Sequence, residues 1–195
     1  AVDASEPELR AWMPWSHLPR TREGEFDIVR GFVADYWAGK QYVMGVFSPA
    51  GDVLGGVGLH PRTPLNARAL EVGYWVHSAH AGKGIVTQAV RAAVVLAFDF
   101  FDCDRLQVQH DVDNGPSQRV VERCGFVHEG GMRNAITELD PKLYASGFKG
   151  TRTSRCYALL PGDLANLDWL AELRRETTLV DALGGPPRKS PFAAP

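Results

Sequence analysis

The stretch Tyr74–Thr87 reads YWVHSAHAGKGIVT, and it decides the fold because it joins a predicted strand to a predicted helix through a glycine-rich turn. Without side chains at Gly82 and Gly84, backbone N–H groups can turn toward a bound anion. The positive end of the helix dipole adds to that attraction. We interpret the turn as a pyrophosphate site, to which Lys83 adds positive charge and Thr87 a hydroxyl donor.

Taken alone, a Gly-x-Gly turn is a weak signal, because glycines frequently do no more than tighten or cap a turn. The spacing differs from a Walker A loop, which needs Gly-Lys-Ser/Thr after a longer gap. It also differs from the full Gly-x-Gly-x-x-Gly dinucleotide fingerprint, since the third position holds Thr87. Nucleotide hydrolysis and hydride transfer are therefore disfavoured.

Outward from this turn, a hairpin-rich first half changes to alternating strands and helices, which predicts an α/β fold with a mixed sheet and helices on both faces. Strands are expected at residues 42–47, 53–59, 69–76, 105–110, 126–132 and 155–160. Helices are expected from Ser5, in a capping box with Glu8, to before Pro14, from Thr21 to Gly39, at 84–101, from about 117 to 124, and from Asp163 to Leu173. The second helix should lie with one apolar side on the sheet. A polar loop is expected at 60–68 and a long insertion at 133–154.

The totals favour a single domain at residues 1–180, followed by a mobile Pro/Gly-rich tail at 181–195. A net charge of -2 argues against a nucleic-acid binder. The longest apolar run, Ala92–Phe98, falls far short of the roughly 20 residues that span a bilayer. The three cysteines lack the spacing of a zinc site and are interpreted as reduced thiols, so we expect a cytoplasmic protein without a metal.

About 30 residues beyond the glycine turn, Asn114 and Ser117 stand at the start of another predicted helix. The amide of Asn114 can bond the amides of an extended pantetheine arm, and the hydroxyl of Ser117 can donate a proton to a leaving sulfur. The alternative is structural: Asn114 starts a turn and Ser117 caps the helix.

These residues together resemble the GNAT acetyltransferases, specifically the RimJ/RimL branch that acetylates protein N-terminal amines. The resembling pieces span most of residues 12–134 and are Trp12-Met13-Pro14-Trp15, Val57-Gly58-Leu59, residues 71–76, Gly82-Lys83-Gly84, Ala97-Phe98, Asn114-x-x-Ser117 and Gly125-Phe126-x-x-Glu129-Gly130.

The resemblance implies a mostly antiparallel sheet that splays at the strand ending in Val76 and admits acetyl-CoA as co-substrate. Val76 would pair with the pantetheine arm, with Asn114 and Ser117 in the roles given above. The pyrophosphate would be held by the backbone amides of Ala81, Gly82, Lys83, Gly84 and Ile85. The acetyl group would pass directly to an amine, without a covalent enzyme intermediate. Two positions depart from the family pattern, Ala79 and Ala81, and the family's first strand is not seen in this sequence.

The amine must be deprotonated, and Glu71, in a strand among apolar residues, is the first candidate for the catalytic base. Glu129 and Glu138 are weaker alternatives. His60, at the end of a strand, is another candidate proton carrier.

The acceptor side of the cleft is assigned to Trp12, Trp15, Tyr74 and Trp75, although aromatic residues are also ordinary core residues. The expected partner is a protein or peptide N-terminal amine, and the protein is expected to be a monomer or homodimer. Two alternatives stay open: acetylation of a small amine, and a non-catalytic module that binds acetyl-CoA.

Overall fold

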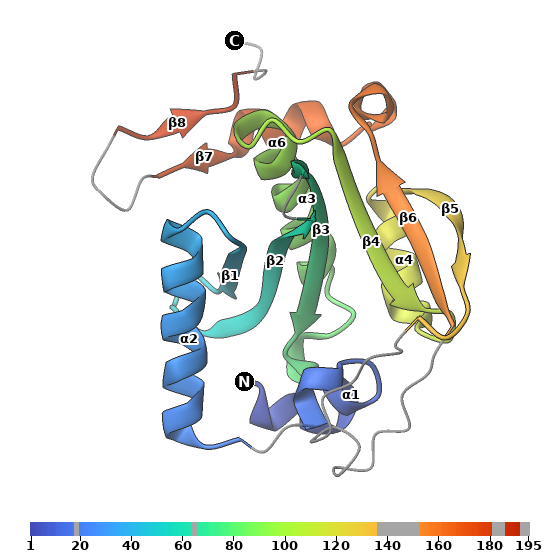
Figure 1. Cartoon of the computed structure of the whole chain (residues 1–195). Coiled ribbons are helices and arrows are strands. Elements are labelled where there is room, and N and C mark those ends of the chain that lie inside the picture. Colours follow the sequence, from blue (N-terminus) through green and yellow to red (C-terminus); the bar gives the residue numbers. More distant parts are fainter. Residues whose placement is uncertain (18–19, 64–65, 136–152, 181–185, 192–195) are drawn as a thin grey trace.

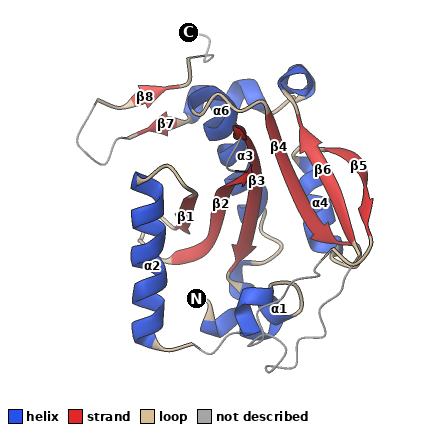
Figure 2. Ribbon diagram, viewed as in Figure 1, coloured by secondary structure: helices blue, strands red, loops and turns tan. Residues whose placement is uncertain are grey.

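A six-stranded sheet forms the centre of the molecule in the computed structural model, which describes residues 1–17, 20–63, 66–135, 153–180 and 186–191 (Figures 1 and 2). The strand order is β1-β2-β3-β4-β6-β5. The pair β3·β4 is parallel and the other pairs are antiparallel, which confirms the mixed, mostly antiparallel sheet expected from the sequence. The bounds are β1 (Tyr42–Phe47), β2 (Val53–Thr63), β3 (Asn66–Val76), β4 (Arg105–Asp111), β5 (Val127–Met132) and β6 (Ser154–Leu159).

Helices lie on both sides of this sheet. In Figure 1, α3 and α4 lie behind the sheet, α2 stands beside its β1 edge, and α1 lies at the lower end of β3. Among the described residues before Tyr42 all the regular structure is helical, so β1 is an edge strand. The helical segments are η1 (Asp3–Ser5), α1 (Glu6–Arg10), η2 (Pro14–His17), α2 (Arg22–Trp37), η3 (Ser78–His80), α3 (Ile85–Val95) with a π-helical turn η4 (Leu96–Phe100), α4 (Gly115–Arg123), η5 (Pro161–Asn166) and α6 (Leu170–Glu176).

The core lies between α3 and the sheet. Side chains alternate along each strand, so every second residue of β2, β3 and β4 faces the helix. These core residues are Val57, Leu59, Leu70, Val72, Leu106 and Val108. They pack against an apolar α3 that contributes Val90, Ala93, Val94 and Val95. This period-two burial leaves the other residues of each strand on the opposite face.

The strands β3 and β4 form a V. They pair at three positions only, from Ala69↔Arg105 to Glu71↔Gln107, and diverge beyond them. Figure 1 shows the two strands separating toward their arrowheads. From residue 72 to Val76, the edge of β3 that faces β4 therefore has no strand partner. The predicted splay of the sheet lies here.

Several predicted boundaries change. The predicted polar loop at residues 60–68 is wrong for most of its length, because β2 runs on to Thr63 and β3 begins at Asn66. Asp163 does not cap the last helix, since its carboxylate accepts from Leu160 N (2.8 Å) within η5, and α6 begins only at Leu170. Most of the predicted insertion, at 136–152, lies outside the described residues.

The helix α2 begins as predicted, with Thr21 Oγ1 accepting from Gly24 N (3.0 Å). Its expected placement on the sheet holds only at its C-terminal end, where the ring of Tyr36 lies 5.5 Å from the ring of Tyr42 in β1. No residue of α2 is buried, and its large apolar side chains are exposed: Phe26, Ile28, Val29, Val33, Tyr36 and Trp37. Apolar spacing in the sequence marks an apolar stripe and leaves its partner undefined.

Part of the predicted mobile tail is held in place. Arg188–Lys189 form β8, which pairs with β7 (Thr178–Leu179). Ser190 is buried and its hydroxyl bonds the carboxylate of Asp99, at the end of the long helix. Residues 181–185 and 192–195 lie outside the described part of the chain.

Candidate active site

The glycine turn lies at the open end of the V, between β3 and α3. Gly82 and Gly84 both have positive φ, +75° and +79°, which disfavours any residue with a side chain. A Cβ added at either position would meet no atom within 4 Å. The first helical N–H that bonds back to the turn is that of Gln88, to Gly84 O (3.0 Å), so the N–H groups of residues 85–87 have no intrahelical acceptor. The turn thus offers open space beside free donors at a helix N-terminus.

Two of the residues predicted to bind the pyrophosphate, Ala81 and Lys83, already donate hydrogen bonds within the turn. The N–H of Ala81 donates to Ser78 O (3.1 Å), so the available backbone donors begin at Gly82 rather than at Ala81. Lys83 Nζ donates to Ala79 O (3.0 Å), which folds the side chain back over the turn. Val76 lies at the free edge of β3, and Thr87 lies in the first turn of α3.

The N-terminal segment that contains Ser5 and Glu8 stabilises the start of the turn through hydrogen bonds. The predicted capping box of Ser5 and Glu8 is wrong, since Ser5 makes no side-chain cap bond. Ser5 Oγ instead accepts from Ser78 N (2.9 Å), and Glu8 accepts from Ser78 Oγ (2.8 Å). The two residues therefore hold the start of η3, which leads into the glycine turn.

Asn114 and Ser117 lie together at the N-terminus of α4, across the V from β3. Asn114 Oδ1 caps the helix by accepting from Ser117 N (3.0 Å), so its Nδ2 group remains as the donor. The hydroxyl of Ser117 lies 2.7 Å from the hydroxyl of Tyr74. Burial raises the pKa of the Tyr74 phenol well above its usual range, which keeps it protonated. The hydroxyl groups of Tyr74 and Ser117 therefore form a hydrogen-bonded pair between β3 and α4.

Tyr74 and Trp75 were both predicted on the acceptor side; the structure places them on opposite faces of β3, and their contact with an acceptor stays a prediction. Neighbouring residues of a strand point to opposite faces, so Tyr74 points toward α4 and Trp75 points the other way. Trp75 covers Gly56, where an added Cβ would lie 2.6 Å from Trp75 Nε1.

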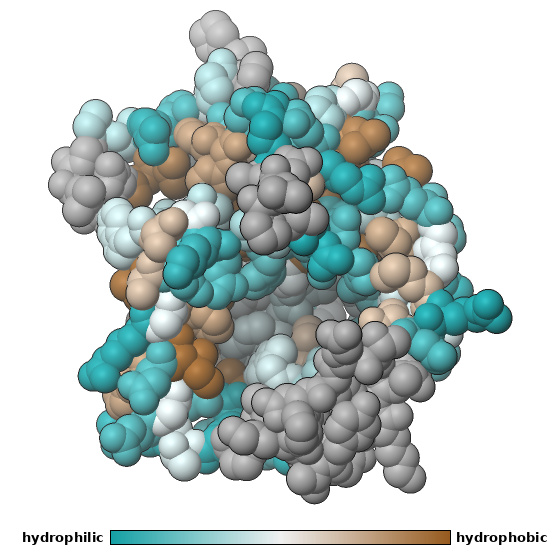
Figure 3. All heavy atoms as spheres, viewed as in Figure 1, coloured by the Kyte–Doolittle hydropathy of each residue, from teal (hydrophilic) through white to brown (hydrophobic). Residues whose placement is uncertain are grey.

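The face of β2, β3 and β4 that points away from α3 forms the open face. It carries glycines beside a few functional side chains: Gly56, Gly58, His60, Arg62, Glu71, Gly73, Trp75 and Gln107. In Figure 3, which views the molecule as in Figure 1, the centre of the surface is hollowed, and hydrophobic side chains along α2 form one wall of the hollow. The hollow lies over the glycine-rich strands and reaches the V.

Glu71 sits on the open face at the point where β3 and β4 part. Its carboxylate accepts from Gln107 Nε2 (3.0 Å) and pairs with Arg62 NH1 (3.2 Å), and a quarter of the side chain is exposed. His60 lies directly opposite Glu71 in the β2·β3 ladder. The alternative Glu129 forms a bidentate pair with Arg105, and Glu138 lies outside the described residues.

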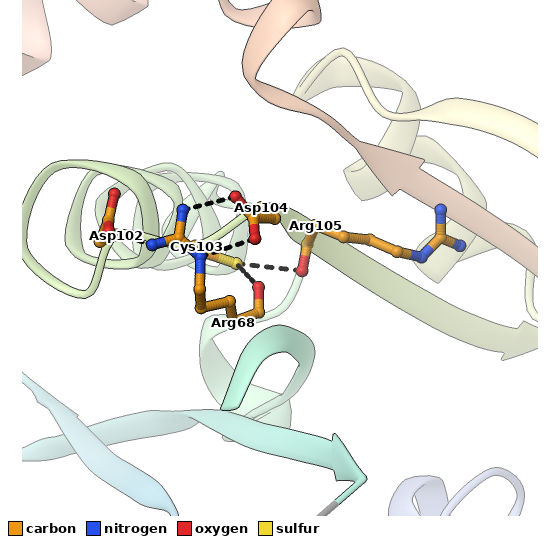
Figure 4. Close-up of polar contacts among 5 residues, drawn as sticks. All are labelled: Arg68, Asp102, Cys103, Asp104 and Arg105. Carbon is orange, nitrogen blue, oxygen red and sulfur yellow. Dashed lines mark hydrogen bonds and ion pairs between the residues drawn. The ribbon is translucent and has the colours of Figure 1, made fainter. Parts of the chain in front are cut away.

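The closed end of the V is held by a cluster of polar contacts around Arg68, drawn in Figure 4. Its guanidinium pairs with Asp102 and with both carboxylate oxygens of Asp104 (2.6 Å each). Asp104 N and Cys103 Sγ both donate to Arg68 O. These bonds join the start of β3 to the start of β4, so the strands can separate only at their other end.

Trp12 lies between α1 and η2, and Trp15 lies within η2. Trp12 is partly buried and Trp15 is exposed. Their predicted place on the acceptor side stays a prediction.

Among the residues that the structure describes, no three His, Cys, Asp or Glu side chains gather as a metal site would require.

Comparison with known proteins gives one family and several relatives. The family described as acetyltransferase (GNAT) domain matches residues 2–127. A ribosomal-protein-serine acetyltransferase of Escherichia coli is 28% identical over 127 residues, which are 65% of this chain and 70% of that protein. YdaF of Bacillus subtilis is 36% identical over 86 residues, 44% of this chain and 46% of YdaF, so the alignment spans about half of its length. A solved RimL ribosomal alpha-N-protein acetyltransferase in complex with coenzyme A shares the fold, with a TM-score of 0.70, 23% identity and coverage of 82% of this chain and 84% of that one.

Proposed function

Because this chain belongs to the GNAT acetyltransferase family, we propose that it transfers an acetyl group from acetyl-CoA to a primary amine. The observation that carries the proposal is the V between β3 and β4, which opens onto the glycine turn at its wide end and onto Glu71 at its apex. An extended thioester-bearing arm fits such a slot, with its phosphates at a helix N-terminus.

The free backbone donors of the turn support binding of the cofactor. We assign the pyrophosphate to the N–H groups from Gly82 to Thr87, and the pantetheine arm to the unpaired edge of β3 up to Val76. Asn114 Nδ2 would bond an amide of that arm. Acetyl-CoA, when bound, supplies the acetyl group as a thioester.

The chemistry is divided between the two faces of β3. On one face, the hydroxyl pair of Ser117 and Tyr74 would donate a proton to the leaving sulfur. On the other, Glu71 and its neighbours on the open face would take the proton that the amine gives up. The bond from nitrogen to the carbonyl carbon forms as the carbon–sulfur bond breaks. Exchange with water then restores both groups.

We infer that the acceptor is a protein or peptide N-terminal amine. The hollow over the open face is broad, and apolar side chains of α2 line it, which suits the side chains of an extended peptide better than a polycationic polyamine. The name of the Escherichia coli relative supports this acceptor class.

The proposed function can be tested by thiol release from acetyl-CoA with purified protein. Peptides with a free N-terminus should release CoA, and the same peptides with a blocked N-terminus should not. Release with spermidine or an aminoglycoside alone would identify a small-amine acetyltransferase instead. Cofactor binding without release on any amine would identify a non-catalytic module.

Replacing Tyr74 tests the hydroxyl pair. Tyr74→Phe removes the partner of Ser117 Oγ, and losing one hydrogen bond of about 1 to 1.5 kcal/mol should lower kcat about tenfold. The Kd of acetyl-CoA, measured by calorimetry, should stay within twofold. Tyr42→Phe, in β1 and packed against the core away from the V, is the matched control and should leave both constants unchanged. A kcat of Tyr74→Phe equal to that of the control would remove the hydroxyl pair from the mechanism.

A further inference from the structure

The imidazole of His60 is folded over the backbones of β2 and β3 on the open face. An added Cβ at Gly58 would lie 2.6 Å from His60 Nε2, and one at Gly73 would lie 3.6 Å from it. Any side chain at position 58 would therefore displace the ring of His60. The two facing glycines, Gly58↔Gly73, create the space that the ring occupies beside the apex of the V.

The neighbours of His60 determine which ring nitrogen carries the proton. Gln41 Nε2 donates to Asp35 Oδ2 (2.6 Å), because a carboxylate can only accept, and this orients the Gln41 amide. Its oxygen, Gln41 Oε1, then lies 3.0 Å from His60 Nδ1 and accepts from it. The neutral ring thus holds its proton on Nδ1, and Nε2 has a free lone pair.

We propose that Nε2 of His60 accepts the proton of the amine during acetyl transfer, and that Glu71 stabilises the imidazolium that forms. This inference rests on the proposed function and assigns its proton acceptor. As nitrogen bonds to the carbonyl carbon and the carbon–sulfur bond breaks, one proton passes from nitrogen to Nε2. The leaving sulfur takes one proton from the Ser117 side, so charge and protons balance once both groups exchange with water.

Glu71 is less suited to accept the proton itself. Its Oε2 atom already accepts from the guanidinium of Arg62 (3.2 Å) and from the amide of Gln107 (3.0 Å), so two donors compete for that oxygen. Burial lowers the pKa of His60 from its ordinary value, and the charge of Glu71 partly opposes this. The other charged groups near the ring are Arg62, in the same strand, and Asp35, through Gln41. At neutral pH the imidazole is therefore uncharged and ready to accept.

The pH dependence of kcat/KM separates the two residues. A base must be deprotonated to act, so the wild-type rate should rise with pH along an acid limb below pH 6.5, the ordinary pKa of histidine. His60→Gln should lower kcat/KM about 100-fold and abolish that limb. Glu71→Gln should lower it about tenfold and keep the limb, moved to lower pH, because the charge that raises the His60 pKa is gone. The opposite pattern, with the limb lost in Glu71→Gln and kept in His60→Gln, would overturn the assignment.

Two further variants distinguish loss of the proton acceptor from misfolding as the cause of lost activity. His60→Ala should regain activity with added imidazole, which a purely structural role would not produce. Gly58→Ala should reduce kcat/KM with His60 still present, because the new Cβ displaces the ring. His128→Gln, an exposed histidine on the edge strand β5, is the matched control and should retain wild-type kinetics. Failure of rescue together with normal kinetics in Gly58→Ala would argue against His60.

Nitrogen NMR of labelled protein provides a readout independent of turnover. The His60 signals, identified by their loss in His60→Gln, should show the Nδ1–H tautomer and titrate below pH 6.5. An Nε2–H tautomer would contradict the inference while leaving the proposed acetyl transfer intact. Absence of thiol release by the wild-type protein with every amine would instead defeat the proposed function itself.

Discussion

Gly84→Val should weaken acetyl-CoA binding about 30- to 100-fold. Gly84 has φ +79° at the N-cap of α3, a conformation that costs an L-residue about 1 to 2 kcal/mol and a β-branched residue more. Relief of this strain would turn the free N–H groups away from the phosphates, and the side chain would fill the open space beside them. Together these effects correspond to about 2 to 3 kcal/mol of binding energy. Calorimetric titration with acetyl-CoA measures the change.

Gly51→Val is the matched control for this substitution. Gly51 also has a positive φ, +90°, and open space where a Cβ would lie, but it belongs to the β1–β2 turn. It should suffer the same backbone strain and keep the wild-type Kd. Equal Kd values for wild type and Gly84→Val, or an equal loss in Gly51→Val, would mean that the phosphates bind elsewhere.

The sequence was most informative where local chemistry alone determines conformation. The glycine turn and the Thr21 cap depend on neighbouring residues, and each was found where it was predicted. The core strands were also recognisable, because alternation along β2, β3 and β4 marks one buried face. The same alternation could have separated Tyr74 from Trp75, since adjacent strand residues cannot share a face.

Contacts between distant segments were not predictable in this way. Ser5 was expected to cap its own helix, yet its hydroxyl bonds the backbone of Ser78, because the fold brings η1 beside η3. The pairing of Gln41 with His60, and of Tyr74 with Ser117, likewise joins residues far apart in the chain. No local pattern marks such pairs, so His60 was named from the sequence only as an alternative proton carrier.

Asp99→Ala should cause the largest loss of stability, about 3 to 5 kcal/mol, because it removes a fully buried carboxylate that bonds Arg174 at two nitrogens. The Asp99 side chain is fully buried, and its carboxylate accepts from Arg174 Nε (2.9 Å) and NH2 (2.7 Å) and from Ser190 Oγ. These bonds tie the end of the long helix to α6 and to the tail. The free energy of unfolding, measured by urea denaturation, should fall by that amount, and Tm should fall by roughly 10 °C.

Asp102→Ala provides the comparison, because it also removes a carboxylate from an arginine pair. Asp102 is 83% exposed in its pair with Arg68, and exposed pairs contribute about 1 kcal/mol or less. In Asp102→Ala the guanidinium of Arg68 also keeps its pair with Asp104, and the φ of +52° at position 102 adds some backbone strain for alanine. If both lost the same small amount of stability, the Asp99–Arg174 pair would be behaving as a solvated ion pair, and the tail would not depend on it. The loss of stability in Ser190→Ala should lie between those of Asp99→Ala and Asp102→Ala. This substitution removes a bond to Asp99 and leaves the Asp99–Arg174 pair in place.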